Sequence, residues 1–206
     1  MEKESQTIFD KNVIEFVTVA AEFCAFLERA ERMKRSTFVD TSLKILPLLY
    51  LKASMLPKCE TIGDEALETY VTEEIYEILR INLSGLMADK DDYLDVFVQD
   101  MVYSDQPIKK SISEDLADIY QDIKDFIFVF QLGLNETMND SLAICQENFG
   151  TLWGQKLVNT LRALHDVKYN QEEEEEVGNE EGFYEPSDDN DCCEEDGCHC
   201  HDDELK

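Results

Sequence analysis

The sequence predicts an all-α protein, built as a single bundle of about seven helices followed by a disordered acidic tail. Apolar residues recur at i, i+3 and i+4 over most of residues 7–168, which is the period of helices that face a core. No alternating strand pattern competes with this period. The formal net charge of the 206 residues is −29, and residues 170–206 contribute 17 acidic residues and one lysine to it.

Helix start and stop signals divide the periodic region into segments. Pro47 predicts a kink inside the second helix, and Pro57 predicts its end. Thr72 is a good N-cap for the third helix. Ser111 begins a capping box, and Gly133 is suited to the position just after a helix. The predicted helices span roughly residues 7–33, 37–55, 72–87, 91–103, 111–133, 136–149 and 151–168.

The fifth predicted helix, "SISEDLADIYQDIKDFIFVFQLG", has the clearest division into two faces. Its apolar face carries Ile112, Leu116, Ile119, Tyr120, Ile123, Phe126, Ile127 and Phe130. Its acidic face carries Glu114, Asp115, Asp118, Asp122 and Asp125. The pattern predicts an apolar side packed into the core and an acidic side that is either solvated or matched by a cation.

Composition predicts two regions, a helical domain over 1–169 and a disordered tail over 170–206. The tail offers little apolar surface to offset the entropy of ordering it. We expect a cytoplasmic protein, because the charged N-terminus lacks the apolar stretch of a signal peptide. A membrane role is not expected, since the longest apolar run, "ILPLLYL", is far short of a membrane span. Direct nucleic-acid binding is not expected either, because basic residues are few and interleaved with acidic ones.

Three stretches carry a resemblance to a known family: "VTEEIYE", "SISEDLADIYQDIKDF" and "WGQKLVNTLRALH". Together they resemble a bacterial all-helical family catalogued as domain of unknown function 5063. The resemblance covers most of residues 7–168, and the tail lies outside it. It implies a soluble helical protein and gives no catalytic residue to carry over. It also suggests that the polar residues inside these stretches belong to the family's common feature.

One alternative is a Mg²⁺-dependent nucleotide pyrophosphohydrolase of the all-α kind. Glu73, Glu74 and Glu77 match the first acidic motif of such enzymes. The second motif, Glu-x-x-Asp, fails, because Ala117 stands three residues after Glu114. The acidic helix offers Asp-x-x-Asp pairs instead, which share a helix face and supply the oxygen ligands that Mg²⁺ prefers. With 47 acidic residues in the chain, chance matches are expected.

The end of the chain, "DCCEEDGCHCHDDELK", concentrates soft and borderline metal ligands. Its thiols and imidazoles could bind Zn²⁺, Ni²⁺ or copper, although the spacing is not that of a zinc finger. This predicts a chelating end, and metal storage or delivery through it is a second alternative function. No cofactor is expected to be required. The candidate metal ligands are Cys192, Cys193, Cys198, His199, Cys200 and His201.

The most promising surface in the bundle pairs the fifth and seventh predicted helices. Like charges at i, i+4 destabilise a helix, so the acidic stripe suggests a countercharge. Arg162 is the cation predicted to meet Asp118 or Asp122, within the monomer or across a dimer. The candidate interaction surface comprises Glu114, Asp118, Asp122, Asp125, Gln155, Asn159 and Arg162. The leading functional prediction is therefore a non-enzymatic interaction or adaptor module with an unknown protein partner.

Overall fold

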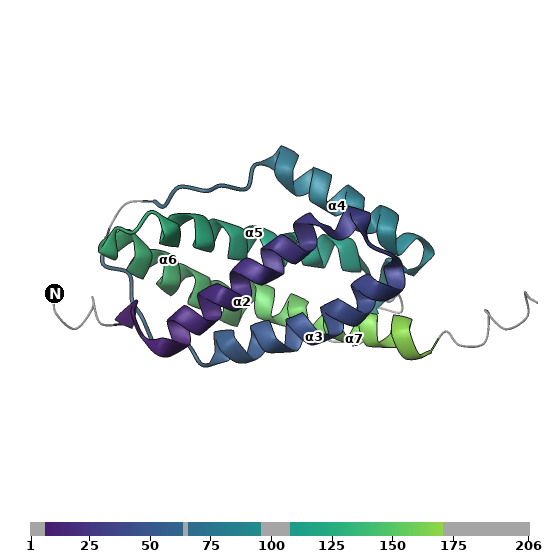
Figure 1. Cartoon of the computed structure of the whole chain (residues 1–206), viewed down its shortest axis with the longest axis horizontal. Helices are drawn as coiled ribbons and strands as arrows, with labels where there is room; N and C mark the ends of the chain where they lie inside the picture. Colours follow the sequence, from purple (N-terminus) through teal and green to yellow (C-terminus); the bar gives the residue numbers. More distant parts are fainter. Residues whose placement is uncertain (1–6, 64–65, 96–107, 171–206) are drawn as a thin grey trace, which may run out of the picture. The chain divides into compact units, whose positions relative to one another are not determined.

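A computed structural model describes residues 7–63, 66–95 and 108–170, which all lie within one structural unit. Helices dominate these residues, as the sequence predicts (Figure 1). The elements are α2 (Lys11–Glu28), α3 (Arg35–Ser54), α4 (Glu73–Met87), β1 (Asp92–Asp95), β2 (Ile108–Ser111), α5 (Ile112–Gln131), α6 (Asn135–Asn148) and α7 (Gly154–Tyr169). Short 3-10 turns at Ala30–Arg32 and Ala88–Lys90 follow α2 and α4.

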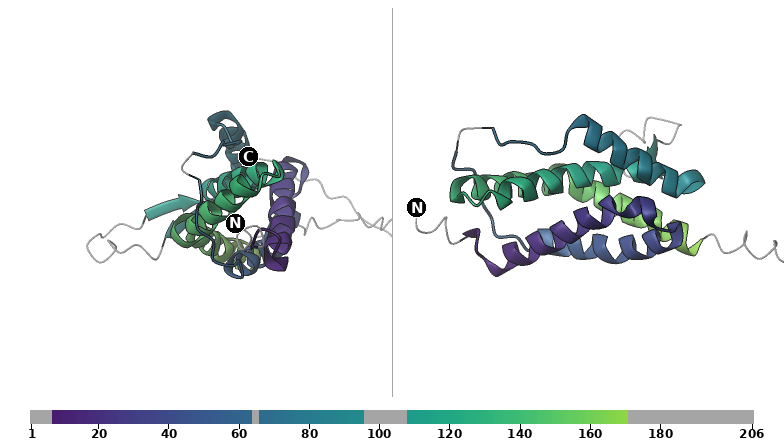
Figure 2. Two further views of the ribbon diagram at one scale, coloured as in Figure 1. Left: turned by 90° about the vertical axis from the view of Figure 1, so that its left-hand side faces the viewer. Right: turned by 45° about the horizontal axis from the view of Figure 1, so that its top comes forward.

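Helix α5 is the central element of the bundle. It packs against α2, α4, α6 and α7, so it has neighbours on every side. Figures 1 and 2 show α4 and α3 on opposite sides of it, and α3 packs mainly on α2 and α7. The predicted apolar face of α5 is buried throughout, apart from Phe130, which is half-buried. The largest fully buried side chains are contributed by α2, α3 and the π-helical turn just before α7: Phe16, Phe23, Phe38 and Trp153.

The predicted cap residues are confirmed. The Thr72 hydroxyl accepts a hydrogen bond from the backbone N–H of Ile75, and that of Ser111 accepts one from Glu114 N–H. Gly133 follows α5 with a φ of 76°, a conformation that an L side chain disfavours. Pro47 lies inside α3, as predicted. These local signals therefore give the start of α4 and both ends of α5 correctly.

The predicted count of seven helices is wrong, because the part of the chain that the structure describes contains five. Helices α6 and α7 are continuous through a π-helical turn at Phe149–Trp153, so residues 135–169 form one long helix. Gly150 separates the two helices predicted over residues 136–149 and 151–168. In the structure it lies inside the long helix, and nothing lies within 4 Å of the position that a Cβ would take there. The backbone N–H of Gly154 donates to the carbonyl of Phe149, five residues earlier. This bond, which is typical of a π-helical turn, keeps the helical backbone continuous from α6 to α7.

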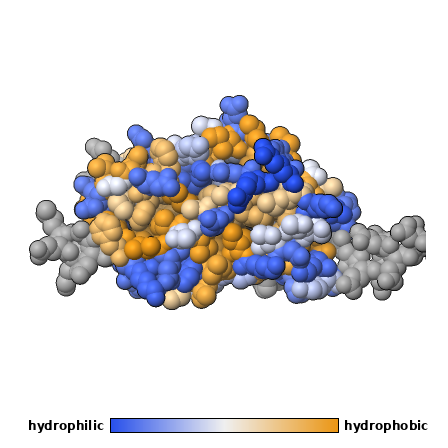
Figure 3. Space-filling view, in the orientation of Figure 1, coloured by the Kyte–Doolittle hydropathy of each residue, from blue (hydrophilic) through white to orange (hydrophobic). Residues whose placement is uncertain are grey.

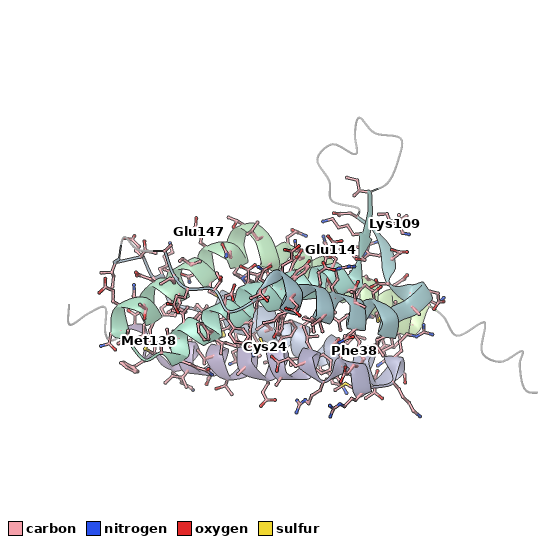
Figure 4. All side chains as sticks on the ribbon, turned by 90° about the horizontal axis from the view of Figure 1, so that it is seen from above. Cys24, Phe38, Lys109, Glu114, Met138 and Glu147 are labelled. Carbon is pink, nitrogen blue, oxygen red and sulfur yellow. The ribbon has the colours of Figure 1, made fainter. Side chains whose placement is uncertain are left out.

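The helix predicted over residues 91–103 is also wrong, at least where the structure describes it. Residues 92–95 form β1, which pairs antiparallel with β2 in the register Asp92 to Ser111. Figure 4 shows this hairpin, which carries Lys109, projecting from the helices near Glu114 on the first turn of α5. A single two-stranded sheet needs packing against another element, and here Tyr93 and Asp95 of β1 are turned toward the bundle. The expectation of no strand failed because four-residue strands leave too short a pattern to recognise.

None of the helices in the described residues is long and apolar enough to cross a bilayer.

Candidate functional site

The acidic face of α5 lies against other elements, which supply partners for its carboxylates. Asp118 accepts a hydrogen bond from the Tyr76 hydroxyl of α4 at 2.8 Å. The same carboxylate forms an ion pair with the ammonium of Lys156 on α7. Asp118 therefore links α4, α5 and α7, and a countercharge for the acidic stripe exists within the monomer.

Asp122 and Asp125 accept hydrogen bonds from neutral donors. The Asn148 side-chain amide donates to Asp122 at 2.7 Å. The backbone N–H groups of Tyr70 and Val71 donate to Asp125 at 2.7 and 2.8 Å, which fixes the chain just ahead of α4. Burial raises the pKa of both carboxyl groups, and these hydrogen bonds oppose that rise in part.

Asp115 is buried, with 4% of its surface exposed, whereas the sequence placed it on the acidic outer face. It accepts hydrogen bonds from the Tyr93 hydroxyl of β1 and the Thr160 hydroxyl of α7. Burial raises the pKa of Asp115 and, together with the neighbouring carboxylate, that of Tyr93. Asp115, which lies on α5, thus connects β1 of the hairpin with α5 and α7.

The polar residues of α7 divide into two groups. Gln155 donates to the Asn159 side chain at 3.0 Å, and Asn159 is buried beside the hairpin. Arg162 is exposed and makes no ion pair among the described residues. Within the monomer, the cation beside Asp118 is therefore Lys156 and not Arg162, while Glu114 is exposed at the start of α5.

A pocket of about 460 Å³ lies between β1 and α7, and we call it the β1–α7 groove. One wall is β1 over its full length, Asp92–Asp95, with Asp89 and Lys90 just before it. The opposite wall is one stripe of α7: Asn159, Arg162, Ala163, Asp166 and Val167. Ile112, the first residue of α5, also lines it. The groove therefore includes Asn159 and Arg162 of the predicted interaction surface, and none of its α5 carboxylates.

The acidic residues of the groove are mostly matched by cations. Asp89 pairs with Arg35 at 2.8 Å, and the ammonium of Lys90 lies 3.4 Å from the Asp89 carboxylate. Asp92 pairs with Lys109 at 2.6 Å, and Asp95 pairs with Lys110 at 3.1 Å. Asp166 accepts from the Asn170 side chain, one turn along α7 from Arg162. Arg162 and Asp166 are thus the charged groups of the groove without an ion-pair partner in the described residues.

The acidic motif of the hydrolase alternative is not assembled with the α5 carboxylates. Glu73 and Glu74 are exposed at the first turn of α4, and Glu77 pairs with Arg80 at 2.7 Å. In residues 7–63, 66–95 and 108–170, no three carboxylate, imidazole or thiol side chains are grouped so that they could hold a metal ion. The geometry therefore gives this alternative no support.

The candidate metal ligands of the chain end lie outside the described residues. These are Cys192, Cys193, Cys198, His199, Cys200 and His201. Binding of zinc, nickel or copper there stays a prediction, as does the disorder of the tail.

Sequence reasoning missed several partners of the acidic face. Tyr93 falls within the helix predicted over residues 91–103, and Lys156 is not on the side of α7 that carries Gln155, Asn159 and Arg162. A signal was present for two of them, because Tyr76 lies in "VTEEIYE" and Lys156 lies in "WGQKLVNTLRALH". Both stretches carry the family resemblance, so their polar residues were reasonable candidates for contacts with the acidic helix.

Asparagine substitutions at Asp118 and Asp122 are expected to have opposite effects on stability. Asp118→Asn removes one charge of a partly buried ion pair and should lower the free energy of unfolding by about 1 kcal/mol. Lys156→Met should then add little to it, because both variants break the same pair. Asp122→Asn should raise stability at pH 7, since burial disfavours the charged carboxylate there. Thermal melts of the wild type, the three single variants and the double variant at 118 and 156 test this.

The pH dependence separates the two carboxylates further. The pKa of Asp122 is raised in the folded state, so its carboxyl group binds a proton more tightly when folded. The Asp122 carboxyl group stabilises the fold at pH values below its pKa in the unfolded chain. This contribution is lost as the pH rises through its higher pKa in the folded protein. The gain from Asp122→Asn should therefore be largest at pH 7 and vanish near pH 3. Equal losses for Asp118→Asn and Asp122→Asn would contradict this assignment.

Comparisons with known proteins identify relatives of the chain. The family model described as "Domain of unknown function (DUF5063)" matches residues 7–170. A crystal structure of a protein from Bacteroides fragilis, solved by a structural genomics consortium, is 83% identical in sequence. The match covers 79% of this chain and 96% of that chain, with a TM-score of 0.72. No curated protein matches the chain.

Proposed function

Since the chain belongs to the DUF5063 family, in which no activity is established, we propose that it is a non-enzymatic protein-interaction module. Its partner would bind at the β1–α7 groove, at the side of the bundle that carries the hairpin. The proposal also places the protein in the cytoplasm. The free thiols of Cys24, Cys59 and Cys145 are suited to a reducing compartment.

The observation that carries the proposal is the β1–α7 groove itself. A concave site with a few polar groups is where a ligand or partner segment is expected to bind. The groove combines apolar contact area from Leu94, Ala163 and Val167 with the guanidinium of Arg162, which has no ion-pair partner within the described part of the chain. Leu94 is 55% exposed, so the hairpin presents an apolar side chain to a partner without rearrangement.

The carboxylates of α5 already accept hydrogen bonds from neighbouring elements, and this supports a binding role over a catalytic one. A general acid or base must reach a substrate, but Asp115, Asp118 and Asp125 are held by donors from neighbouring elements. These contacts join α4, α5, α7 and the hairpin, which is a structural role. Elsewhere the surface is mixed, since hydrophobic and hydrophilic residues alternate over the face shown in Figure 3.

The proposal is tested by affinity capture with charge-reversed variants of the full chain. Arg162→Glu changes the groove, and Lys11→Glu makes the same change of charge at the far end of α2, where Lys11 is 86% exposed. We expect Lys11→Glu to capture the same partner as the wild type and Arg162→Glu to lose it. A partner retained equally by both variants would place the interaction surface elsewhere.

A further inference from the structure

We infer that the β1–α7 groove takes an extended peptide as a third strand beside β1, with an acidic and a basic side chain two residues apart. This inference rests on the proposed function and specifies the chemistry of the partner. The acidic side chain would meet Arg162, and the basic side chain would meet Asp166. The partner would thus be recognised by its backbone as well as by two charges.

The first argument concerns the free edge of β1. The backbone N–H of Ile112 donates to the carbonyl of Asp91 at 2.8 Å, so residues 91 and 112 stand opposite each other at a hydrogen-bonded position of the ladder, while the N–H of Asp91 donates to Ala88. In an antiparallel ladder such pairs alternate along the strand. The register of β1 and β2 then places Tyr93 and Asp95 in bonded pairs. The N–H and C=O groups of Asp92 and Leu94 therefore point away from β2.

The second argument is the position of the groove relative to the hairpin. All four residues of β1 line it, and no residue of β2 does. The groove thus lies along the open edge of β1 and not over a face of the two-stranded sheet. Addition of an extended segment to a sheet edge, with side chains fitted into an adjacent groove, is an established mode of peptide recognition.

The third argument is the match of spacing between a strand and α7. Arg162 and Asp166 are four residues apart on a helix, which is a rise of about 6.0 Å. Side chains two residues apart on a strand, which share one face, are separated by about 6.6 Å. Both charges lack an ion-pair partner among the described residues, whereas Asp89, Asp92 and Asp95 have cations of their own. One acidic and one basic side chain would satisfy both.

The fourth argument is the exposure of the hairpin. Two strands alone are marginally stable in water, and a third strand adds main-chain hydrogen bonds to such a sheet. Leu94 is 55% exposed, so the hairpin retains apolar surface beside the open edge that a bound segment would cover. A segment lying on the β1 edge would bury Leu94 first.

The test is a nuclear magnetic resonance titration of the full ¹⁵N-labelled chain with synthetic peptides. The probes are acetylated and amidated Thr-Glu-Val-Lys-Thr and its charge-reversed order Thr-Lys-Val-Glu-Thr, at up to millimolar concentration. The neutral control is Thr-Gln-Val-Gln-Thr. We expect the backbone amides of Asp92 and Leu94 to shift with one charge order, because the strand direction fixes which end meets Arg162.

Two modifications then distinguish strand addition from charge attraction alone. Arg162→Ala should weaken the preferred peptide about tenfold, and Arg162→Lys should restore part of that loss. Methylation of one alternate set of peptide amides should abolish binding, while methylation of the other set should leave it unchanged, because a strand offers one edge to β1. Thermal melts confirm that the variants remain folded.

Three outcomes would overturn the inference. They are no shift at Asp92 and Leu94 with either charged peptide, equal shifts with the neutral peptide, and equal effects of the two methylation patterns. If these occur while Arg162→Glu still abolishes capture of the partner, the groove binds a folded surface. In that case the proposed function stands and the strand-addition inference fails. If Arg162→Glu also leaves capture unchanged, both fail.

Discussion

Alanine in place of Asp91 is expected to lower the free energy of unfolding by about 3 kcal/mol, the largest effect of any polar substitution considered. The Asp91 carboxylate accepts hydrogen bonds from the backbone N–H and the hydroxyl of Ser113, at 2.8 and 2.6 Å. Both residues are buried. Removal of the carboxylate leaves two buried donors unsatisfied, at about 1–3 kcal/mol each, and removes a negative charge from the N-terminus of α5.

The matched control is the next residue. Asp92 is exposed and pairs with exposed Lys109, so Asp92→Ala should change the free energy of unfolding by less than about 0.5 kcal/mol. Chemical denaturation of the two variants measures the difference. At about 2–4 °C per kcal/mol for a domain of this size, Asp91→Ala should melt about 6–12 °C lower. Similar stability of the two variants would mean that Asp91 does not anchor the hairpin to α5.

Alanine in place of Gly154 is expected to cost about 2 kcal/mol, because the π-helical turn leaves no room for a Cβ. A Cβ there would lie far inside contact distance of the Phe149 carbonyl oxygen and 3.0 Å from two carbons of its ring. That ring is held between Trp153 and Tyr50, at centroid distances of 4.7 and 5.1 Å, so it cannot easily move. Overpacking of this kind typically costs about 1–3 kcal/mol.

Gly150 supplies the control for this substitution in the same turn. Nothing lies within 4 Å of its added Cβ, so Gly150→Ala should stabilise the helix by about 0.5–1 kcal/mol. Urea denaturation of both variants compares them directly. A gain from both substitutions would show that residues 149–154 can form an ordinary α-helix, and that the π-helical turn is not required.

The π-helical turn matters for the β1–α7 groove because it sets the rotation of α7. One extra residue in a turn rotates everything after it by about 100° relative to an unbroken helix. With the turn in place, Lys156 faces Asp118, and Asn159 and Arg162 face the hairpin. Gly154→Ala should therefore disturb the groove as well as the stability of the bundle.

Local signals in the sequence were sufficient for α4 and α5. Thr72, Ser111 and Gly133 each act through groups within a few residues, so their roles can be derived without the fold. The apolar face of α5 follows from its 3.6-residue period in the same way. These features are determined by neighbours in the sequence, which is why they could be predicted.

The hairpin and the acidic face depend on distant contacts. Tyr93 belongs to a strand because β2, fifteen or more residues later, pairs with it and because Asp115 accepts a hydrogen bond from its hydroxyl. The acidic face of α5 was expected to be solvated or to meet Arg162, since a helical wheel does not show that neighbours surround the helix. The choice of Lys156 over Arg162 depends on which side of α7 packs against α5, and a helical wheel of α7 alone does not show this.

The central claim is that a protein partner contacts the β1–α7 groove, and site-specific photo-cross-linking in cells tests it most directly. A photoreactive phenylalanine analogue at Leu94, 55% exposed, is compared with one at Leu134, 61% exposed, at the opposite end of α5. The account predicts a cross-linked partner from position 94 that disappears with Arg162→Glu, and none from position 134. Cross-links from position 134 and none from position 94 would contradict it.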